Sequence, residues 1–199
     1  MRVLCFPLAS LLAALLCGPA SLLAQQSQPQ TDSALSLAAQ KYFTDVPLVT
    51  QDGREVRFYS DLIKGKVVVI NMFFGTCQGV CPKSAETLSK LQNLLGDRLG
   101  KDVFLLSFSE DPKADTPEKL KAYGEEFHSR PGWLFLTGKK ENVDLALHKL
   151  GEKAERKEDH LTLLMVGNDK TGLWKKVLAN GLTADKLMTI VDSVLQDQE

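Results

Sequence analysis

The sequence predicts an α/β domain in which helices flank a central mixed sheet. Short apolar runs that suit strands alternate with segments whose apolar residues recur at helical spacing. An Asp-Gly pair at Asp52–Gly53 predicts a hairpin near the start of the domain. At 199 residues the chain has room for one domain with its own hydrophobic core. The formal net charge of -1 gives no field that would attract nucleic acid.

The strands are predicted from apolar runs bounded by turn-forming residues. One run, Lys66–Phe74, has almost no polar break, which is typical of a central strand buried on both faces. A second hairpin is expected around the turn Gly167–Gly172. We expect strands at Val46–Thr50, Glu55–Phe58, Lys66–Phe74, Val103–Phe108, Trp133–Leu136, Leu161–Val166 and Leu173–Leu178.

Four helices are predicted from apolar stripes and from their capping residues. Thr116 followed by Pro117 starts one helix, Thr183 caps the last, and Gly96 ends the first. The inward-facing positions are Ala85, Leu88, Leu91 and Leu95, then Leu120, Tyr123 and Phe127, then Val143, Leu147 and Leu150, then Leu187, Ile190, Val191, Val194 and Leu195. A strand-helix-strand half followed by a hairpin and a closing helix is the order of a thioredoxin-like, three-layer fold with an added N-terminal hairpin.

The first residues predict export. Residues 1–24 contain an apolar stretch from Val3 to Leu16 and read as a signal peptide cut after Ala24, with an uncleaved membrane anchor as the alternative. A lipoprotein site at Cys17 is the weaker interpretation, because Leu16 is bulky. Residues 25–41, rich in Gln, Ser and Ala, predict a tether, and residues 42–199 the domain. We therefore expect a periplasmic protein, or one anchored in the membrane and facing the periplasm.

Cys77 and Cys81 are the residues most informative about function. Removal of residues 1–24 leaves them as the only thiols of an exported protein, so their partners are each other, a metal or an external thiol. They lie between a predicted strand and a predicted helix, and Pro82 places Cys81 near the helix N-terminus, where the dipole favours thiolate. Such a pair can hold a soft metal ion or alternate between dithiol and disulfide.

The spacing of the two cysteines favours metal binding without excluding a disulfide. In a regular helix, residues four apart have Cβ atoms about 5–6 Å apart, whereas a relaxed disulfide prefers about 3.5–4.5 Å. Gly79 could let the loop depart from helical geometry and close the bond. An inert staple is the third alternative, although a disulfide that closes so short a loop would constrain little of the unfolded chain.

A metal on two thiolates needs at least one more ligand, and the chain has 3 histidines. His128 and His148 lie in predicted helices and read as scaffold residues. His160 precedes the strand Leu161–Val166, and in a thioredoxin-like arrangement that loop faces the cysteines. Two thiolates and an imidazole suit copper in either oxidation state, and zinc can also bind them. No proline follows Pro131, so the cis-proline of thioredoxin-type oxidoreductases is missing.

Four segments together resemble the Sco/SenC family of copper-binding, thioredoxin-like proteins. They are Thr76–Pro82, Ser107–Pro117, Trp133–Gly138 and Asp159–His160, and the resemblance spans roughly residues 45–196. It implies a copper ion, Cu(I) or Cu(II), held by Cys77, Cys81 and His160 and delivered to the binuclear copper centre of a terminal oxidase. Asp111 matches an acidic position that implies a supporting role beside the metal; alternatively, Asp111 and Asp115 only shape the turn.

Two functions follow from the resemblance. The first is an exported copper metallochaperone, not a conventional enzyme, whose partner is the copper-accepting subunit of a terminal oxidase. The alternative is a thiol-disulfide oxidoreductase in which Cys77 and Cys81 reduce the cysteines of a partner's metal site. A second copper chaperone or a thioredoxin-like reductant are further partners to consider, and membrane contact is expected only through an N-terminal anchor. Gln78–Gly79 and Leu161–Thr162 depart from the residues that many members have there, which affects the partner surface and the metal affinity.

Overall fold

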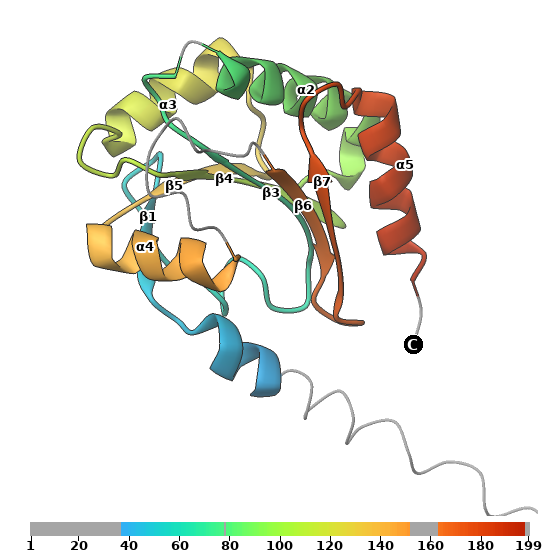
Figure 1. Ribbon diagram of the computed structural model, residues 1–199, viewed down its shortest axis with the longest axis horizontal. Coiled ribbons are helices and arrows are strands. Elements are labelled where there is room, and N and C mark those ends of the chain that lie inside the picture. Colours follow the sequence, from blue (N-terminus) through green and yellow to red (C-terminus); the bar gives the residue numbers. More distant parts are fainter. Residues whose placement is uncertain (1–36, 78, 152–162, 198–199) are drawn as a thin grey trace, which may run out of the picture.

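A seven-stranded mixed sheet with the strand order β2-β1-β5-β4-β3-β6-β7 forms the centre of the molecule (Figure 1). The computed structural model describes residues 37–77, 79–151 and 163–197. The strands are β1 (Pro47–Thr50), β2 (Glu55–Arg57), β3 (Val67–Phe73), β4 (Val103–Ser109), β5 (Trp133–Thr137), β6 (Leu163–Asn168) and β7 (Leu173–Leu178). The predicted α/β fold and both hairpins are confirmed.

The three central strands β3, β4 and β5 run parallel to one another, and the outer pairings are antiparallel. Every residue of β3 is buried, as the continuous apolar run predicts for a strand covered on both faces. In the register of β3 with β4, Phe73 lies opposite Ser109, so both strands end at the same edge of the sheet. The segments that follow these two strands therefore leave the sheet side by side.

Helices cover both faces of the sheet. In Figure 1, α2 (Val80–Leu95), α3 (Pro117–Glu126) and α5 (Ala184–Leu195) lie over one face, and α4 (Lys140–Lys149) lies over the other. Both predicted caps are confirmed: Thr116 Oγ1 accepts a hydrogen bond from the Lys119 N–H at 3.5 Å, and Thr183 Oγ1 accepts one from the Lys186 N–H at 3.3 Å. Each cap satisfies a backbone donor that the first turn of a helix would otherwise leave open.

The side chains of β3 alternate between two core clusters. Val68, Ile70 and Met72 belong to the cluster that packs against α4. Val67, Val69 and Phe73 belong to the cluster beneath α2 and α5. This alternation is the two-residue period of a strand. The second cluster also contains Cys81, which ties the predicted site directly to the core under α2.

Residues 37–43 are helical, so ordered structure begins before the domain boundary predicted at residue 42. Phe43, the last residue of this helix, packs into the first core cluster. It is 8 % exposed and stacks on Tyr59, with ring centroids 6.1 Å apart. A segment rich in Ala and Gln gives no apolar period from which this contact could be predicted. The predicted signal segment, residues 1–24, lies outside the described residues. None of the helices seen in residues 37–77, 79–151 and 163–197 is long and apolar enough to span a membrane.

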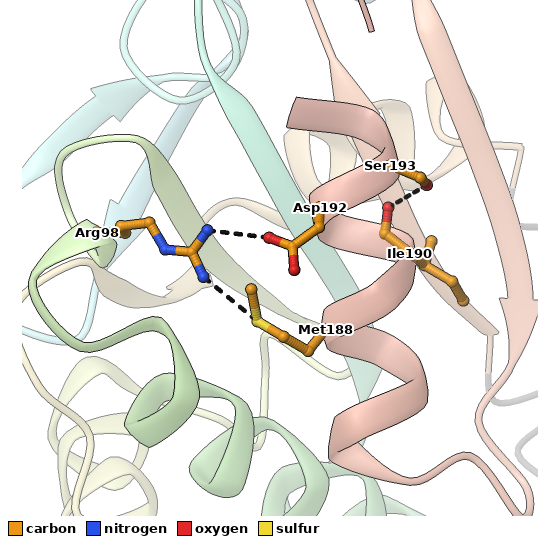
Figure 2. A network of polar contacts seen from close by, with 5 residues as sticks. All are labelled: Arg98, Met188, Ile190, Asp192 and Ser193. Atoms are coloured by element: carbon orange, nitrogen blue, oxygen red, sulfur yellow. Dashed lines mark hydrogen bonds and ion pairs between the residues drawn. The ribbon is translucent and has the colours of Figure 1, made fainter. Parts of the chain in front are cut away.

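A polar contact joins the end of α2 to α5. Arg98 lies in the short 3-10 helix η1 (Gly96–Arg98), directly after α2. Its Nη1 atom is 2.9 Å from Asp192 Oδ1, and its Nη2 atom lies 3.8 Å from Met188 Sδ (Figure 2). Next to Asp192, Ser193 Oγ donates to the Ile190 carbonyl at 2.6 Å. The contact links the segment after α2 to α5 at the surface.

The Arg98→Ala substitution should lower the free energy of unfolding by less than about 1 kcal/mol, because exposed ion pairs are screened by water. The Arg98 and Asp192 side chains are 40 % and 41 % exposed. Urea unfolding followed by circular dichroism measures the change. Leu88→Ala in the buried core provides the contrast, with an expected loss of about 2–5 kcal/mol. A loss for Arg98→Ala as large as that for Leu88→Ala would contradict the assignment of this contact as a surface pair.

Candidate functional site

The two cysteines lie where β3 gives way to α2. Cys77 is in the loop between them, and its N–H donates to the Phe74 carbonyl at 3.0 Å, which closes a turn. Cys81 is the second residue of α2, after the N-cap residue Gly79. The predicted order of strand, cysteine pair and helix is confirmed. The regular-helix spacing used to compare metal with disulfide is wrong here, because Cys77 precedes the helix.

Both cysteines are thiols and are not joined by a disulfide. Cys77 is half-buried, whereas Cys81 is 1 % exposed. The two side chains are hydrogen-bonded to each other. Sulfurs within hydrogen-bonding reach can chelate one ion between them or, on closer approach, form a disulfide. The geometry therefore supports both chemistries that the sequence left open.

Burial determines the protonation of Cys81. Burial and then the hydrogen bond with Cys77 raise the pKa of the Cys81 thiol to about 12, although a backbone hydrogen bond from Phe74 lowers it. The expectation that the helix N-terminus would favour thiolate at Cys81 is therefore wrong for the protein without a metal. The helix dipole contributes only a partial charge, and the loss of water around a buried sulfur outweighs it.

Asp115, in the segment between β4 and α3, supports the cysteine loop. Its Oδ2 atom accepts one hydrogen bond from the Gly75 N–H at 3.0 Å and another from Ser109 Oγ at 2.6 Å. The Asp115 residue is 3 % exposed. Sequence reasoning saw Asp115 only as a turn-shaping residue. Its position after a strand parallel to β3 was the available signal, but the contact with Gly75 depends on a register that the sequence does not specify.

Asp111 makes the contacts of a turn residue. Its Oδ1 atom accepts from the Ala114 N–H at 3.3 Å, and its carbonyl accepts from the Asp115 N–H at 2.9 Å. The Asp111 N–H donates to Ser109 Oγ at 3.1 Å. These bonds agree with the turn-shaping alternative for Asp111. A supporting role beside a metal stays a prediction.

The ring of Tyr123 in α3 lies beside the two thiols. Its ring stacks on Phe73, with centroids 4.8 Å apart and planes at 20°. Burial raises the pKa of the Tyr123 phenol, and negative charge on Cys81 and Cys77 raises it further. Within the described residues, the buried Tyr123 hydroxyl has no hydrogen-bond partner. The phenol thus stays protonated near the dithiol.

The predicted third ligand, His160, falls in residues 152–162 and lies outside the described residues. His128, in the turn after α3, and His148, in the last turn of α4, are both exposed, which agrees with a scaffold role. Across residues 37–77, 79–151 and 163–197, no three His, Cys, Asp or Glu side chains are grouped so as to hold a metal. These residues supply two sulfur ligands, a set that suits soft ions such as Cu(I) or borderline ions such as Zn²⁺.

A central mixed sheet with two cysteines between its first long strand and the following helix defines a thioredoxin-like dithiol protein. The model of the family SCO1/SenC matches residues 36–195. This chain belongs to the SCO1/SenC family.

Relatives in bacteria share about a third of their residues with the chain over the matched part. A SCO2-like protein of Rickettsia conorii is 33 % identical over 99 residues, which are 50 % of this chain and 46 % of that protein. A SCO1 protein homolog of Bacillus subtilis is 36 % identical over 89 residues, covering 44 % of this chain and 45 % of the relative. The chain thus spans about half the length of the curated relatives it matches.

Solved structures show the same fold at lower identity. BsSco, described as a member of the Sco family of cytochrome c oxidase assembly proteins with a disulfide switch, superposes with a TM-score of 0.64 at 24 % identity, covering 78 % of this chain and 94 % of BsSco. Yeast Sco1 with copper bound gives a TM-score of 0.62 at 23 % identity, covering 78 % of this chain and 93 % of the yeast protein. These similarities confirm the thioredoxin-like architecture.

In the reduced, metal-free protein, iodoacetamide at pH 8 should modify Cys77 at least about tenfold faster than Cys81, because only an accessible thiolate reacts. Burial and a pKa of about 12 protect Cys81. Mass spectrometry of peptides sampled over time gives the two rates. In urea-unfolded protein the rates should converge, which serves as the control. Equal rates in the folded protein would contradict the burial of Cys81.

Proposed function

We propose that this protein is an exported copper metallochaperone that holds Cu(I) or Cu(II) through Cys77, Cys81 and His160. Its copper would pass to the binuclear copper centre of a terminal oxidase. The observation that carries the proposal is the pair of reduced, hydrogen-bonded thiols at the end of β3 in a member of the SCO1/SenC family. Copper bound to yeast Sco1, a protein of the same fold, supports it.

The donor set supports copper on chemical grounds. Thiolates are soft ligands that favour Cu(I), and an imidazole adds a donor that also suits Cu(II). Because burial keeps Cys81 protonated in the metal-free protein, an incoming ion must displace its proton. Cys81 packs into the second core cluster, so its sulfur is shielded from water. A site of this kind would hold copper away from solvent until an acceptor arrives.

The unequal exposure of the cysteines suggests how copper would leave. Cys77 lies in the loop and is half-buried, whereas Cys81 is 1 % exposed in the core under α2. An acceptor thiolate can reach an ion on the Cys77 side first. Exchange would then replace Cys77 as ligand before Cys81, so that copper is never released to water. This order matches the stepwise exchange expected of a protein whose cargo is a metal ion.

The second candidate is a thiol-disulfide oxidoreductase that reduces the metal-site cysteines of a partner. The hydrogen bond between Cys77 and Cys81 favours it, because the two sulfurs that would form the disulfide are already in contact. The disulfide switch described for BsSco points in the same direction. No proline follows Pro131 in the sequence, so the chain has no residue to supply the cis-proline that thioredoxin-type oxidoreductases place opposite their cysteines, which favours the chaperone over this candidate.

The proposed location follows from the predicted signal in residues 1–24, which would place the domain in the periplasm, free or anchored in the membrane. The proposed partner is the copper-accepting subunit of a terminal oxidase. A second copper chaperone or a thioredoxin-like reductant would load copper or keep the thiols reduced. A related SCO1/SenC protein of Bacillus anthracis is a lipoprotein, which supports a position at the membrane.

The His160→Ala substitution should abolish tight copper retention while disulfide exchange at Cys77 and Cys81 survives. Loss of a direct ligand should weaken copper binding by more than the about 10–100-fold that loss of a supporting residue costs. Copper titration of the reduced domain, followed by the thiolate-to-Cu(II) charge-transfer band, measures the affinity. Reduction of a mixed disulfide measures the exchange.

His128→Ala and His148→Ala are the matched controls, because both remove an exposed imidazole outside the proposed site. Neither should alter the charge-transfer band. If His160→Ala binds copper like the parent protein, histidine ligation is wrong. If copper never produces the band while exchange is rapid, the oxidoreductase replaces the chaperone as the function.

A further inference from the structure

Asp115 connects the cysteine loop to the segment between β4 and α3. Its carboxylate Oδ2 accepts from the Gly75 N–H at 3.0 Å and from Ser109 Oγ at 2.6 Å. Its own N–H donates to the Asp111 carbonyl at 2.9 Å, which fixes the backbone of the turn. At 3 % exposure, Asp115 makes these bonds away from water, where they are hard to replace.

A short series of backbone contacts leads from Asp115 to the thiols. Gly75, which Asp115 holds, follows Phe74 directly. The Phe74 carbonyl accepts from the Cys77 N–H at 3.0 Å, and the backbone of Phe74 also hydrogen-bonds Cys81. Cys81 is already fixed as the second residue of α2. Cys77 is in the loop, so its position depends on the turn that Asp115 holds.

The approach between Gly75 and Asp115 leaves no room for a side chain at position 75. A Cβ atom there would come closer to Asp115 Oδ1 than real Cβ atoms come to any neighbour. Gly75 has no left-handed backbone conformation that would itself require glycine. The glycine is therefore needed for contact with the carboxylate, and alanine at this position would push the loop away from Asp115.

We propose that Asp115 is a positioning residue that holds Cys77 against Cys81 and thereby promotes every reaction in which the two sulfurs must meet. Copper chelation and disulfide formation both require the sulfurs to meet, and a held loop has already lost the conformational freedom that either reaction would otherwise cost. Without the carboxylate, Cys77 samples positions away from Cys81, and both equilibria weaken. The copper part rests on the proposed function, whereas the disulfide part does not.

The test compares Asp115→Ala and Gly75→Ala with the parent protein in two assays. The first assay, without metal, measures the dithiol-disulfide equilibrium in glutathione buffers. The second measures Cu(I) affinity by competition with a chelator whose Cu(I) complex is followed by its absorption. Each variant should shift the disulfide equilibrium about tenfold toward the dithiol, which raises the reduction potential by about 30 mV. Cu(I) affinity should fall by a similar factor. Because Gly75→Ala keeps the carboxylate, it separates loss of the contact from loss of the charge.

The double variant Gly75→Ala with Asp115→Ala shows whether the two residues act through one contact. The effects should not add, because the second substitution breaks a contact that the first has already removed. Asp115→Asn keeps an acceptor oxygen and should recover part of the parent behaviour in both assays.

Asp45→Ala is the matched control for a general loss of stability. The Asp45 carboxylate also accepts two backbone hydrogen bonds, from the Tyr59 N–H at 3.1 Å and the Ser60 N–H at 2.8 Å. The turn that it holds packs into the other core cluster, through Phe58 and Tyr59. Asp45→Ala should therefore lower the free energy of unfolding without changing either thiol assay.

The outcomes separate this inference from the copper proposal. If the reduction potential shifts in the variants but neither the variants nor the parent protein binds copper, the positioning role stands and the chaperone function fails. Unchanged potentials in both Asp115→Ala and Gly75→Ala would overturn the positioning role, as would an equal shift in Asp45→Ala. If Asp115→Ala does not fold, Gly75→Ala alone decides, because it alters only the exposed side of the contact.

Discussion

The parallel register between β3 and β4 is the constraint on which the site depends. It places Phe73 opposite Ser109, and the Glu110 N–H extends the pairing by donating to the Phe73 carbonyl at 2.9 Å. The cysteine loop and the turn that contains Asp115 therefore leave the sheet at one point. Gly75 and Asp115, 40 residues apart in the chain, meet only because of this register. A different pairing of the two strands would leave Cys81 on its helix and Cys77 without support.

The sequence predicts the described secondary structure well because each element has a local cause. Continuous apolar runs give the buried strands, and Thr116 and Thr183 start helices through bonds within one turn. Prediction fails where a distant partner decides. The helix at residues 37–43 depends on burying Phe43 against the core. The same reason explains why the Asp115 contact could not be predicted: its partner Gly75 carries no side chain that would indicate one.

The pKa of Cys81 shows the same limit within the site. From sequence, a cysteine beside the first turn of a helix is expected to ionise readily, and that local effect is present. The fold adds a larger effect, because Cys81 packs among apolar residues of α2, α5 and the sheet. The charged form of its sulfur loses water there, and the pKa rises. The motif thus identifies which residues react, whereas burial sets the protonation state of Cys81 in the absence of metal.

Metal binding and disulfide formation make the same first demand on this loop, and the geometry of the two sulfurs alone cannot choose between them. Each requires Cys77 to come to Cys81, and the contact seen here serves both. The difference lies in what completes the reaction. A copper ion bound by the two sulfurs gains from a third ligand, whereas a disulfide between them needs only an oxidant. A histidine brought to this edge by the loop before β6 would therefore favour copper, while leaving the redox chemistry of the pair intact. The cysteine pair supplies the reactivity, and a third ligand from another part of the chain would select between the two uses.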